Sequence, residues 1–278
     1  MMYKKNNILN SDQLKNYFQT NVLANGMFHC KHASVCEASH LNNGGQNSKQ
    51  RFYKGQLHHI GKYYDLSTQD TPLRIMVVGQ EYGHEPALVD FAERYDMLMD
   101  SAAIGFKARN PHMKGTSSLL RLLHGLSLGT DHAGEFIQVD GEPVHLFDTF
   151  VLANYLLCSA LAGNSAQGQA TPEMKSNCAE HFAVTLEMLK PSVLIIQGIG
   201  FWEKAIKQLF AGRLEKIDDT LYQANFRGNE ILMGVFAHPS AAAYGFWGNS
   251  VASNYLLNTV KPTVEKMREL LLNESVCA

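Results

Sequence analysis

Three polar side chains follow apolar runs of the sequence, at places where acid–base chemistry is possible. Glu81 lies in GQEYG, Asn154 opens NYLLC, and His238 opens HPS. A carboxylate can accept a proton or stabilise a cation, an amide offers both a donor and an acceptor, and an imidazole can stabilise negative charge. Each also has an ordinary role: Glu81 in a solvated loop, Asn154 as a cap, His238 in a turn. The functional hypothesis therefore depends on the set, which could act on one small polar ligand.

Four cysteines form a second group with possible chemistry. Cys30 and Cys36 lie in HCKHASVC, Cys158 follows Asn154 by four residues, and Cys178 lies in TPEMKSNC. Four thiolates fit an iron–sulfur cluster or a tetrahedral zinc ion. Two alternatives stay open. The cysteines could be small buried apolar residues, or the first pair could form a zinc site with nearby histidines: His29, His32 and His40.

The elements that must position these residues follow from the apolar patterns. Short apolar segments predict four buried strands, at 73–78, 146–153, 192–197 and 231–237. Helical patterns lie at 11–24, 86–100, 117–124, 172–190, 201–211 and 254–272, and the polar stretch 40–54 is typical of a loop. Strands that alternate with helices predict right-handed crossovers and a mostly parallel sheet. Ligands bind beyond the carboxyl ends of such strands, where all three polar side chains would lie.

Bulk composition narrows the class of protein. The chain has 278 residues, 45% of them hydrophobic and 18% charged, which is typical of a globular domain. A net charge of −2 gives no general signal for nucleic acid, although phosphates respond to local patches. No apolar run is long enough to cross a membrane, and the first residues contain no signal peptide. We therefore expect a cytoplasmic protein with reduced cysteines. The motif GIGFWE lacks the third glycine of a dinucleotide fingerprint.

The order and spacing of these motifs resemble the uracil-DNA glycosylase superfamily, most closely its iron–sulfur branch, family 4. The resemblance runs from about residue 27 to about residue 250 and is most specific between Asn154 and Gly198. NYLLC repeats the family's asparagine with a cluster cysteine four residues later. The other matching segments are GQEYG, PHMKGTSSLL (111–120), GNSAQGQATPEMKSNC, LKPSVLIIQG (189–198) and HPS.

Several positions depart from the family pattern. Five residues separate Cys30 from Cys36 where the family usually has two, and the second cysteine pair is also wider. Gln80 stands where family 4 has glutamate, and Glu81 stands where family 1 has aspartate. His112 replaces the phenylalanine that stacks on the base. The segment SAAAYGFWG replaces the usual intercalating leucine loop, with three candidate residues for that role: Tyr244, Phe246 and Trp247.

The resemblance implies a three-layer α/β/α fold with a central four-stranded, mostly parallel sheet. It implies one domain over 1–278, with a helical, cysteine-bearing segment (1–60) packed on it. The implied activity is excision of uracil or a related damaged base from DNA, by a monomer that contacts no membrane. The implied residues are Glu81, His238 and Gln80 in catalysis; Asn154, His112, Tyr82 and Gly79 at the base; and Cys30, Cys36, Cys158 and Cys178 as ligands of a 4Fe–4S cluster, or of zinc.

Two other functions remain open at this stage. The first is an altered superfamily member that binds DNA or a nucleobase without excising uracil, or excises another lesion. The shifted carboxylate of Glu81 and the histidine at 112 favour it. The second is an unrelated α/β enzyme with a zinc site. Metal analysis separates the second from a cluster protein, since a zinc protein is colourless.

Overall fold

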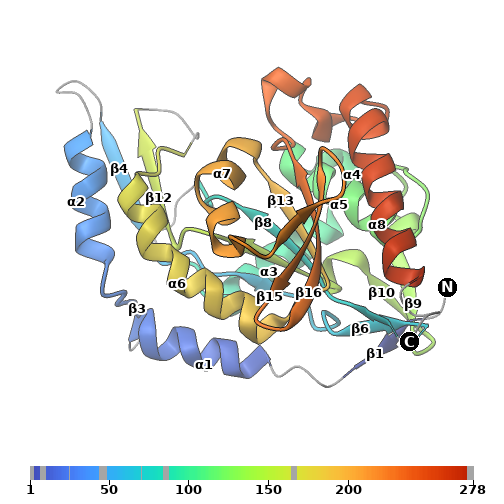
Figure 1. Cartoon of the computed structure of the whole chain (residues 1–278), viewed down its shortest axis with the longest axis horizontal. Helices are drawn as coiled ribbons and strands as arrows, with labels where there is room; N and C mark the ends of the chain where they lie inside the picture. Colours follow the sequence, from blue (N-terminus) through green and yellow to red (C-terminus); the bar gives the residue numbers. More distant parts are fainter. Residues whose placement is uncertain are drawn as a thin grey trace.

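The computed structural model describes residues 3–6, 11–24, 26–43, 49–69, 71–83, 88–163 and 168–273. Its centre is a seven-stranded sheet in the order β14-β15-β16-β13-β8-β11-β5 (Figure 1). The strands of this sheet span β5 (His59–Ile60), β8 (Ile75–Gly79), β11 (Phe150–Asn154), β13 (Val193–Gln197), β14 (Leu214–Lys216), β15 (Leu221–Phe226) and β16 (Asn229–Phe236).

The four predicted strands form the parallel middle of this sheet. β13 pairs in parallel with both β16 and β8, and β8 pairs in parallel with β11. The expected four-stranded sheet is nevertheless too small, because antiparallel strands extend it on both sides. These strands, β5, β14 and β15, are short or alternate in polarity. They therefore lack the continuous apolar run that revealed the buried strands.

Helices cover both faces of the sheet, so the architecture is three-layered α/β/α (Figure 1). Side chains alternate along each buried strand: Met76 and Val78 join one apolar cluster, while Ile75 and Val77 join the other. The first cluster packs α1 (Ser11–Asn21), α6 (Pro172–Leu189) and α7 (Ile199–Lys204) on the sheet. The second packs α3 (Phe91–Ala103), α5 (Pro111–Leu123) and α8 (Lys261–Asn273) on the opposite face, and the short helix α4 (Gly105–Ala108) contacts α3 and α5.

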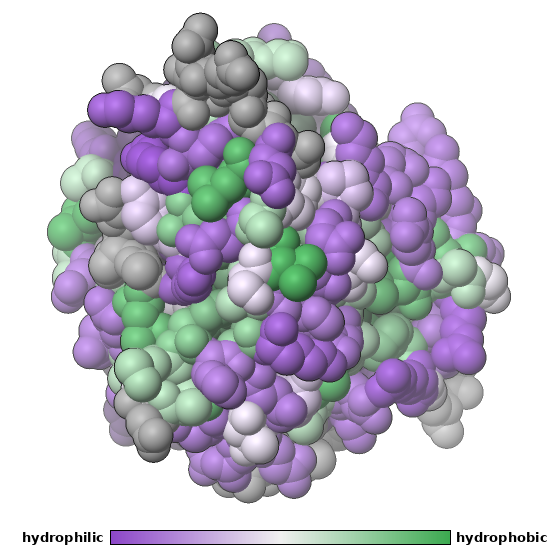
Figure 2. All heavy atoms as spheres, turned by 90° about the vertical axis from the view of Figure 1, so that its left-hand side faces the viewer, coloured by the Kyte–Doolittle hydropathy of each residue, from purple (hydrophilic) through white to green (hydrophobic). Residues whose placement is uncertain are grey.

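The N-terminal segment packs against α6 through α1 and α2 (Ala33–Asn43). The predicted loop at 40–54 is partly wrong, because α2 extends into it and β4 (Gln50–Lys54) closes it. β4 pairs with β12 (Cys158–Ala162), so a long-range partner decides the conformation of this polar stretch. The face that carries α2, β4 and β12 mixes hydrophilic and hydrophobic residues (Figure 2).

Small sheets complete the structure. They contain β1 (Lys4–Lys5), β2 (Leu23–Ala24), β3 (Met27–Phe28), β6 (Leu66–Thr68), β7 (Thr71–Leu73), β9 (Phe136–Val139) and β10 (Glu142–His145).

Two helices begin at other residues than the apolar pattern predicts, because side-chain caps determine where they start. Asp90 accepts the N–H groups of Ala92 and Glu93, so α3 begins later than predicted; Asn110 caps α5, which begins earlier. Among the described residues, no helix is both long and apolar enough to span a membrane.

Candidate active site

The predicted polar residues lie at the carboxyl ends of the parallel strands. β8 and β11 end together, with Asn154 paired to Gly79 in the register. The carbonyl of Gly79 accepts the N–H of Tyr155 (3.0 Å), which ties the loop after β11 to the loop that carries Glu81. His238 follows β16 by two residues. An added Cβ at Gly79 would meet no described atom within 4 Å, so the described residues leave open space beside this strand end.

Glu81 is held by hydrogen bonds to both carboxyl oxygens. Gln80 Nε2 donates to Oε1 and the backbone N–H of Ala160 donates to Oε2, each at 2.7 Å. Gly168 lies directly against Oε1, at a distance that leaves no room for a side chain. Burial raises the pKa of Glu81 to about 7, although both hydrogen bonds and the charge of Lys175 act in the opposite direction. The carboxyl group is therefore poised to change protonation near neutral pH. Gln80 acts here as its partner.

Asn154 presents a buried amide at the end of β11. The residue is 5% exposed, and no described atom accepts a hydrogen bond from its Nδ2. Its backbone N–H donates to Nδ1 of His58 at 3.3 Å. Burial lowers the pKa of His58 to about 3, so this imidazole is a neutral acceptor. A buried amide donor without a partner costs free energy, which a ligand with a carbonyl oxygen would recover.

His112 and His238 stack on each other, with ring centroids 5.1 Å apart and an angle of 19° between planes. Gln197, the last residue of β13, orients His112. Its Nε2 donates to Thr116 Oγ1 (3.2 Å), and its Oε1 faces His112 Nε2 at 2.6 Å. Nε2 of His112 therefore carries the proton and donates to Gln197. Gln197 is not among the residues predicted from the sequence, although it occupies the same strand-end position as the predicted ones.

Both imidazoles are neutral near pH 7. Burial, followed by the charge of His238, lowers the pKa of His112 to about 3, and burial also lowers the pKa of His238. Nδ1 of His238 accepts the N–H of Ser240 at 3.2 Å, so its proton lies on Nε2. His238 can therefore donate a hydrogen bond through Nε2. One face of His112 is covered by His238, which leaves at most its other face for a base.

The loop after His238 is locked onto α5 by close packing. A Cβ on Gly115 would lie 2.7 Å from Cβ of Pro239 and 3.1 Å from the ring of Trp247. Trp247 is completely buried and donates from Nε1 to the carbonyl of Ala237 at 2.9 Å. Trp247 is therefore unavailable for the surface role considered for it. The two other candidates are exposed: Tyr244 (40%) and Phe246 (45%).

Tyr82 faces α3. Its ring lies 4.4 Å from the guanidinium carbon of Arg94, and its hydroxyl contacts Met97 Sδ at 3.7 Å. One face of the ring is thus covered by a cation. The motif continues into residues 84–87, and His84 lies outside the described residues.

The four cysteines gather between the N-terminal segment, β12 and α6. All four are free thiols, and each sulfur lies close enough to the others for a negative charge on one to raise the pKa of the next. Burial has the larger effect and raises the pKa of Cys178 to about 12. Two α6 side chains contact the sulfurs of the first pair: Asn177 Nδ2 donates to Cys36 Sγ at 3.4 Å, and His181 Nε2 lies 3.6 Å from Cys30 Sγ.

The spacing of these thiols bears on the choice of metal. Zn–S bonds of about 2.3 Å place the sulfurs of a tetrahedral zinc site about 3.8 Å apart. In the described part of the chain, no three of the thiol sulfurs lie within 4.8 Å of one another. A compact four-thiolate zinc site is therefore not preformed among the described residues. Of the nearby histidines, His40 Nε2 lies 3.1 Å from the carbonyl oxygen of Leu161, and His32 Nε2 lies 3.5 Å from Glu180.

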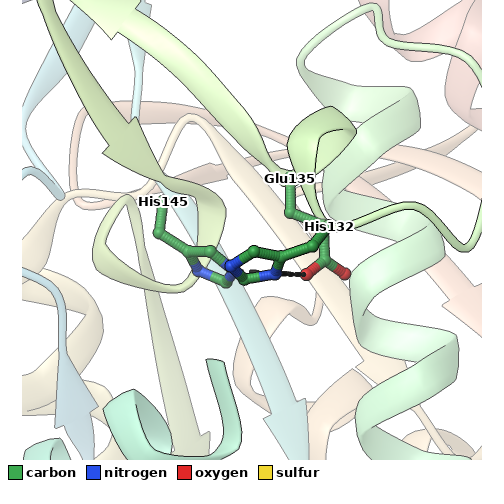
Figure 3. Close-up of side chains that lie close together, drawn as sticks. All are labelled: His132, Glu135 and His145. Atoms are coloured by element: carbon green, nitrogen blue, oxygen red, sulfur yellow. Dashed lines mark hydrogen bonds and ion pairs between the residues drawn. The ribbon is translucent and has the colours of Figure 1, made fainter. Parts of the chain in front are cut away.

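Another group has the composition of a metal site: His132, Glu135 and His145 (Figure 3). Arg109 already binds both oxygens of Glu135, at 2.5 and 2.7 Å. His145 Nδ1 accepts the N–H of Phe147, so its Nε2 carries a proton and donates to Glu135 at 3.3 Å. A protonated nitrogen cannot bind a metal, and the buried guanidinium repels one. These residues form an ion-pair network that anchors η1 (Ala133–Glu135) beside α5.

No family model matches this chain. No curated protein matches it either.

Proposed function

We propose that this protein is a DNA glycosylase that flips out uracil or a related deaminated base and hydrolyses its glycosidic bond. The observation that supports this proposal most is the unpartnered amide of Asn154. It lies at the same strand edge as Glu81 and His238, beside the open space at Gly79. An amide donor aimed at a carbonyl is what recognition of a base edge needs.

Each of the candidate residues would have a different role in the reaction. Extrusion brings the base into the site, because a duplex hides the glycosidic bond. As the bond breaks, the sugar becomes positively charged and the base leaves with the bonding electrons. The Glu81 carboxylate would stabilise the cation and orient water, whose oxygen adds to the sugar while one of its protons passes to the carboxylate. His238 would donate from Nε2 to the departing base, and Asn154 would hydrogen-bond its edge. His112, held by Gln197, would keep the ring of His238 in place.

The cysteines would hold a 4Fe–4S cluster. The positions of these cysteines in the fold indicate a structural role for it. Cys30 and Cys36 lie in the N-terminal segment, Cys158 begins β12, and Cys178 lies in α6. Ligation would therefore join three elements that are distant in the sequence. Burial raises the pKa values of Cys158 and Cys178, so ligation would have to displace the protons of these thiols.

A superfamily member with altered specificity is the second candidate. Two observations favour it: both oxygens of Glu81 accept hydrogen bonds from the protein, and His112 has one face against His238. Such a protein would keep the pocket and act on another base, or bind without cleavage.

Excision assays test the proposal. Purified protein is incubated with labelled oligonucleotides that carry uracil, hypoxanthine or xanthine, and alkali then breaks the strand at abasic sites. We expect breaks with the wild type, none with Glu81→Gln, and normal breaks with Glu203→Gln, which alters an exposed carboxylate paired to Lys207. No break at any lesion, from protein that retains iron and sulfide, would refute glycosylase activity and leave the binding function.

A further inference from the structure

Arg94 is a buried cation beside the candidate active site. It lies in the first turn of α3, after the Asp90 cap, and is 6% exposed. Its guanidinium group lies 4.4 Å from the ring centre of Tyr82, the residue after Glu81. The side chain therefore points inward, toward the loop that follows β8.

Arg94 differs from the other buried arginines in the described part of the chain. Arg109 binds Glu135, Arg74 binds Asp65 at 2.7 Å, and Arg121 contacts Asp131 at 3.3 Å. Arg94 forms no ion pair with a described carboxylate, and its Nε is buried without a hydrogen-bond partner. Among the described residues, the ring of Tyr82 is the only group that compensates this buried charge, so an anionic ligand would stabilise it further.

The charge of Arg94 acts on the residues around the proposed base pocket. After burial, it is one of the influences that lower the pKa values of His58 and His112. His58 accepts the backbone N–H of Asn154, and His112 stacks on His238. Arg94 therefore lies near both the amide that would read the base and the imidazole pair that would face it.

We infer that Arg94 is the anion-binding residue of the pocket and selects nucleobases that carry negative charge. The ligand class is a free oxopyrimidine or oxopurine, bound as the anion whose charge is left on the ring when the glycosidic bond breaks. This inference rests on the proposed function and extends it to substrate class. A guanidinium beside an anionic oxygen forms a charge-assisted hydrogen bond, about twice as strong as a neutral one.

Binding of free bases tests this inference without any cleavage. Calorimetry at pH 8 compares uracil with 5-fluorouracil, which has nearly the same shape and a more acidic ring N–H. We expect the wild type to bind 5-fluorouracil about tenfold more tightly, as one charge-assisted hydrogen bond allows. In Arg94→Met the ratio of the affinity for 5-fluorouracil to the affinity for uracil should fall to about twofold or less, and in Arg94→Lys it should lie between these values.

A stability measurement separates this role from a structural one. Removing an unpaired buried charge should leave the midpoint of thermal unfolding of Arg94→Met equal to or above that of the wild type. A lower midpoint with an unchanged base preference would make Arg94 structural and overturn the inference. Weaker binding of undamaged duplex by Arg94→Met, with the preference kept, would overturn it too, since the anion would then be a backbone phosphate.

The affinities of the wild-type protein for the two free bases can also contradict the inference. Equal affinity for the two bases overturns the anion site and leaves glycosylase activity intact. Binding of neither base also overturns it, and the proposed function falls with it only if the excision assay is negative as well.

Discussion

Burial drives the candidate catalytic side chains toward their neutral forms, with different consequences for each. It raises the pKa of Glu81 to about 7 and lowers that of His238, so the carboxyl titrates near neutral pH while the imidazole stays neutral. A neutral imidazole that donates from Nε2 suits an anionic leaving group, because its hydrogen bond stabilises the developing negative charge while the proton stays on the ring.

Excision should depend on the charge of Glu81. We expect the rate to rise as pH increases through about 7, because the carboxylate is the active form and burial raises the pKa to about 7. His112, whose pKa is about 3, does not titrate in this range. A pH–rate profile between pH 5 and 9 measures this, and a flat profile would remove Glu81 ionisation from the mechanism.

The same pKa shift has a cost in stability. The folded protein binds the Glu81 proton more strongly than the unfolded chain, whose carboxyl has the ordinary value of 4.5. The free energy of unfolding should therefore fall as pH rises from 4.5 to about 7. Glu81→Gln should be inactive, more stable than the wild type above that window and similar below it. Urea titrations at pH 4.5 and 8 compare the two proteins. If Glu81→Gln were less stable than the wild type at pH 8, this would contradict the raised pKa of Glu81.

Asn154 should contribute to function more than to stability. Its Nδ2 has no described partner to lose, so Asn154→Ala should change the free energy of unfolding by less than about 1 kcal/mol. Excision should fall by at least about tenfold, the effect of one lost hydrogen bond to the base. Urea unfolding and excision kinetics measure the two quantities, and a large loss of stability with normal excision would contradict this assignment.

Among the elements, α5 and the loop after β16 must fit closely to keep the histidine pair stacked. Gly115 allows that approach, because its Cα side faces Pro239 and Trp247. His112 lies one turn earlier on α5, and His238 immediately precedes Pro239. The geometry of the imidazole pair is thus set by a glycine that has no chemistry of its own.

Gly115→Ala should force these elements apart. We expect it to destabilise the protein by about 1–3 kcal/mol, as overpacking does, and to reduce kcat for excision. Gly200→Ala is the matched control, since its added methyl would meet no atom within 4 Å in α7 and its effect should be small or stabilising. If both variants unfold alike and excise normally, the contact between α5 and the loop has no role in positioning His238.

At the scale of the whole molecule, the four free cysteines lie where the N-terminal segment meets the α/β/α core, and the proposed cluster would join the two. Loss of one cluster ligand should loosen α1 and α2, whose other contacts include α6, β2 and β4. Cys178→Ser should lose iron and visible absorbance and become cleavable by protease in the first 60 residues. Cys277→Ser is the control for a general thiol effect. Zinc instead of iron in the wild type would refute the cluster.

Prediction from the sequence worked where a local pattern has one physical cause. Apolar runs found the four parallel strands, and strand ends located Glu81, Asn154 and His238 at one edge of the sheet. Pro172 after Thr171 predicted the start of α6, because the cap and the fixed φ of proline act within a few residues. The edge strands β5, β14 and β15 and the pairing of β4 with β12 were missed, since distant partners decide them.

The types and order of the candidate catalytic residues were fixed by the sequence, and their chemical states were decided only by the tertiary structure. Burial and contacts between distant residues neutralise His58 and His112 and bring Glu81 to a pKa of about 7. The same long-range contacts orient His112 through Gln197, bury Trp247 and leave Arg94 without a described carboxylate. Spacing along a chain specifies which groups can meet, but desolvation and partners depend on every element packed around them.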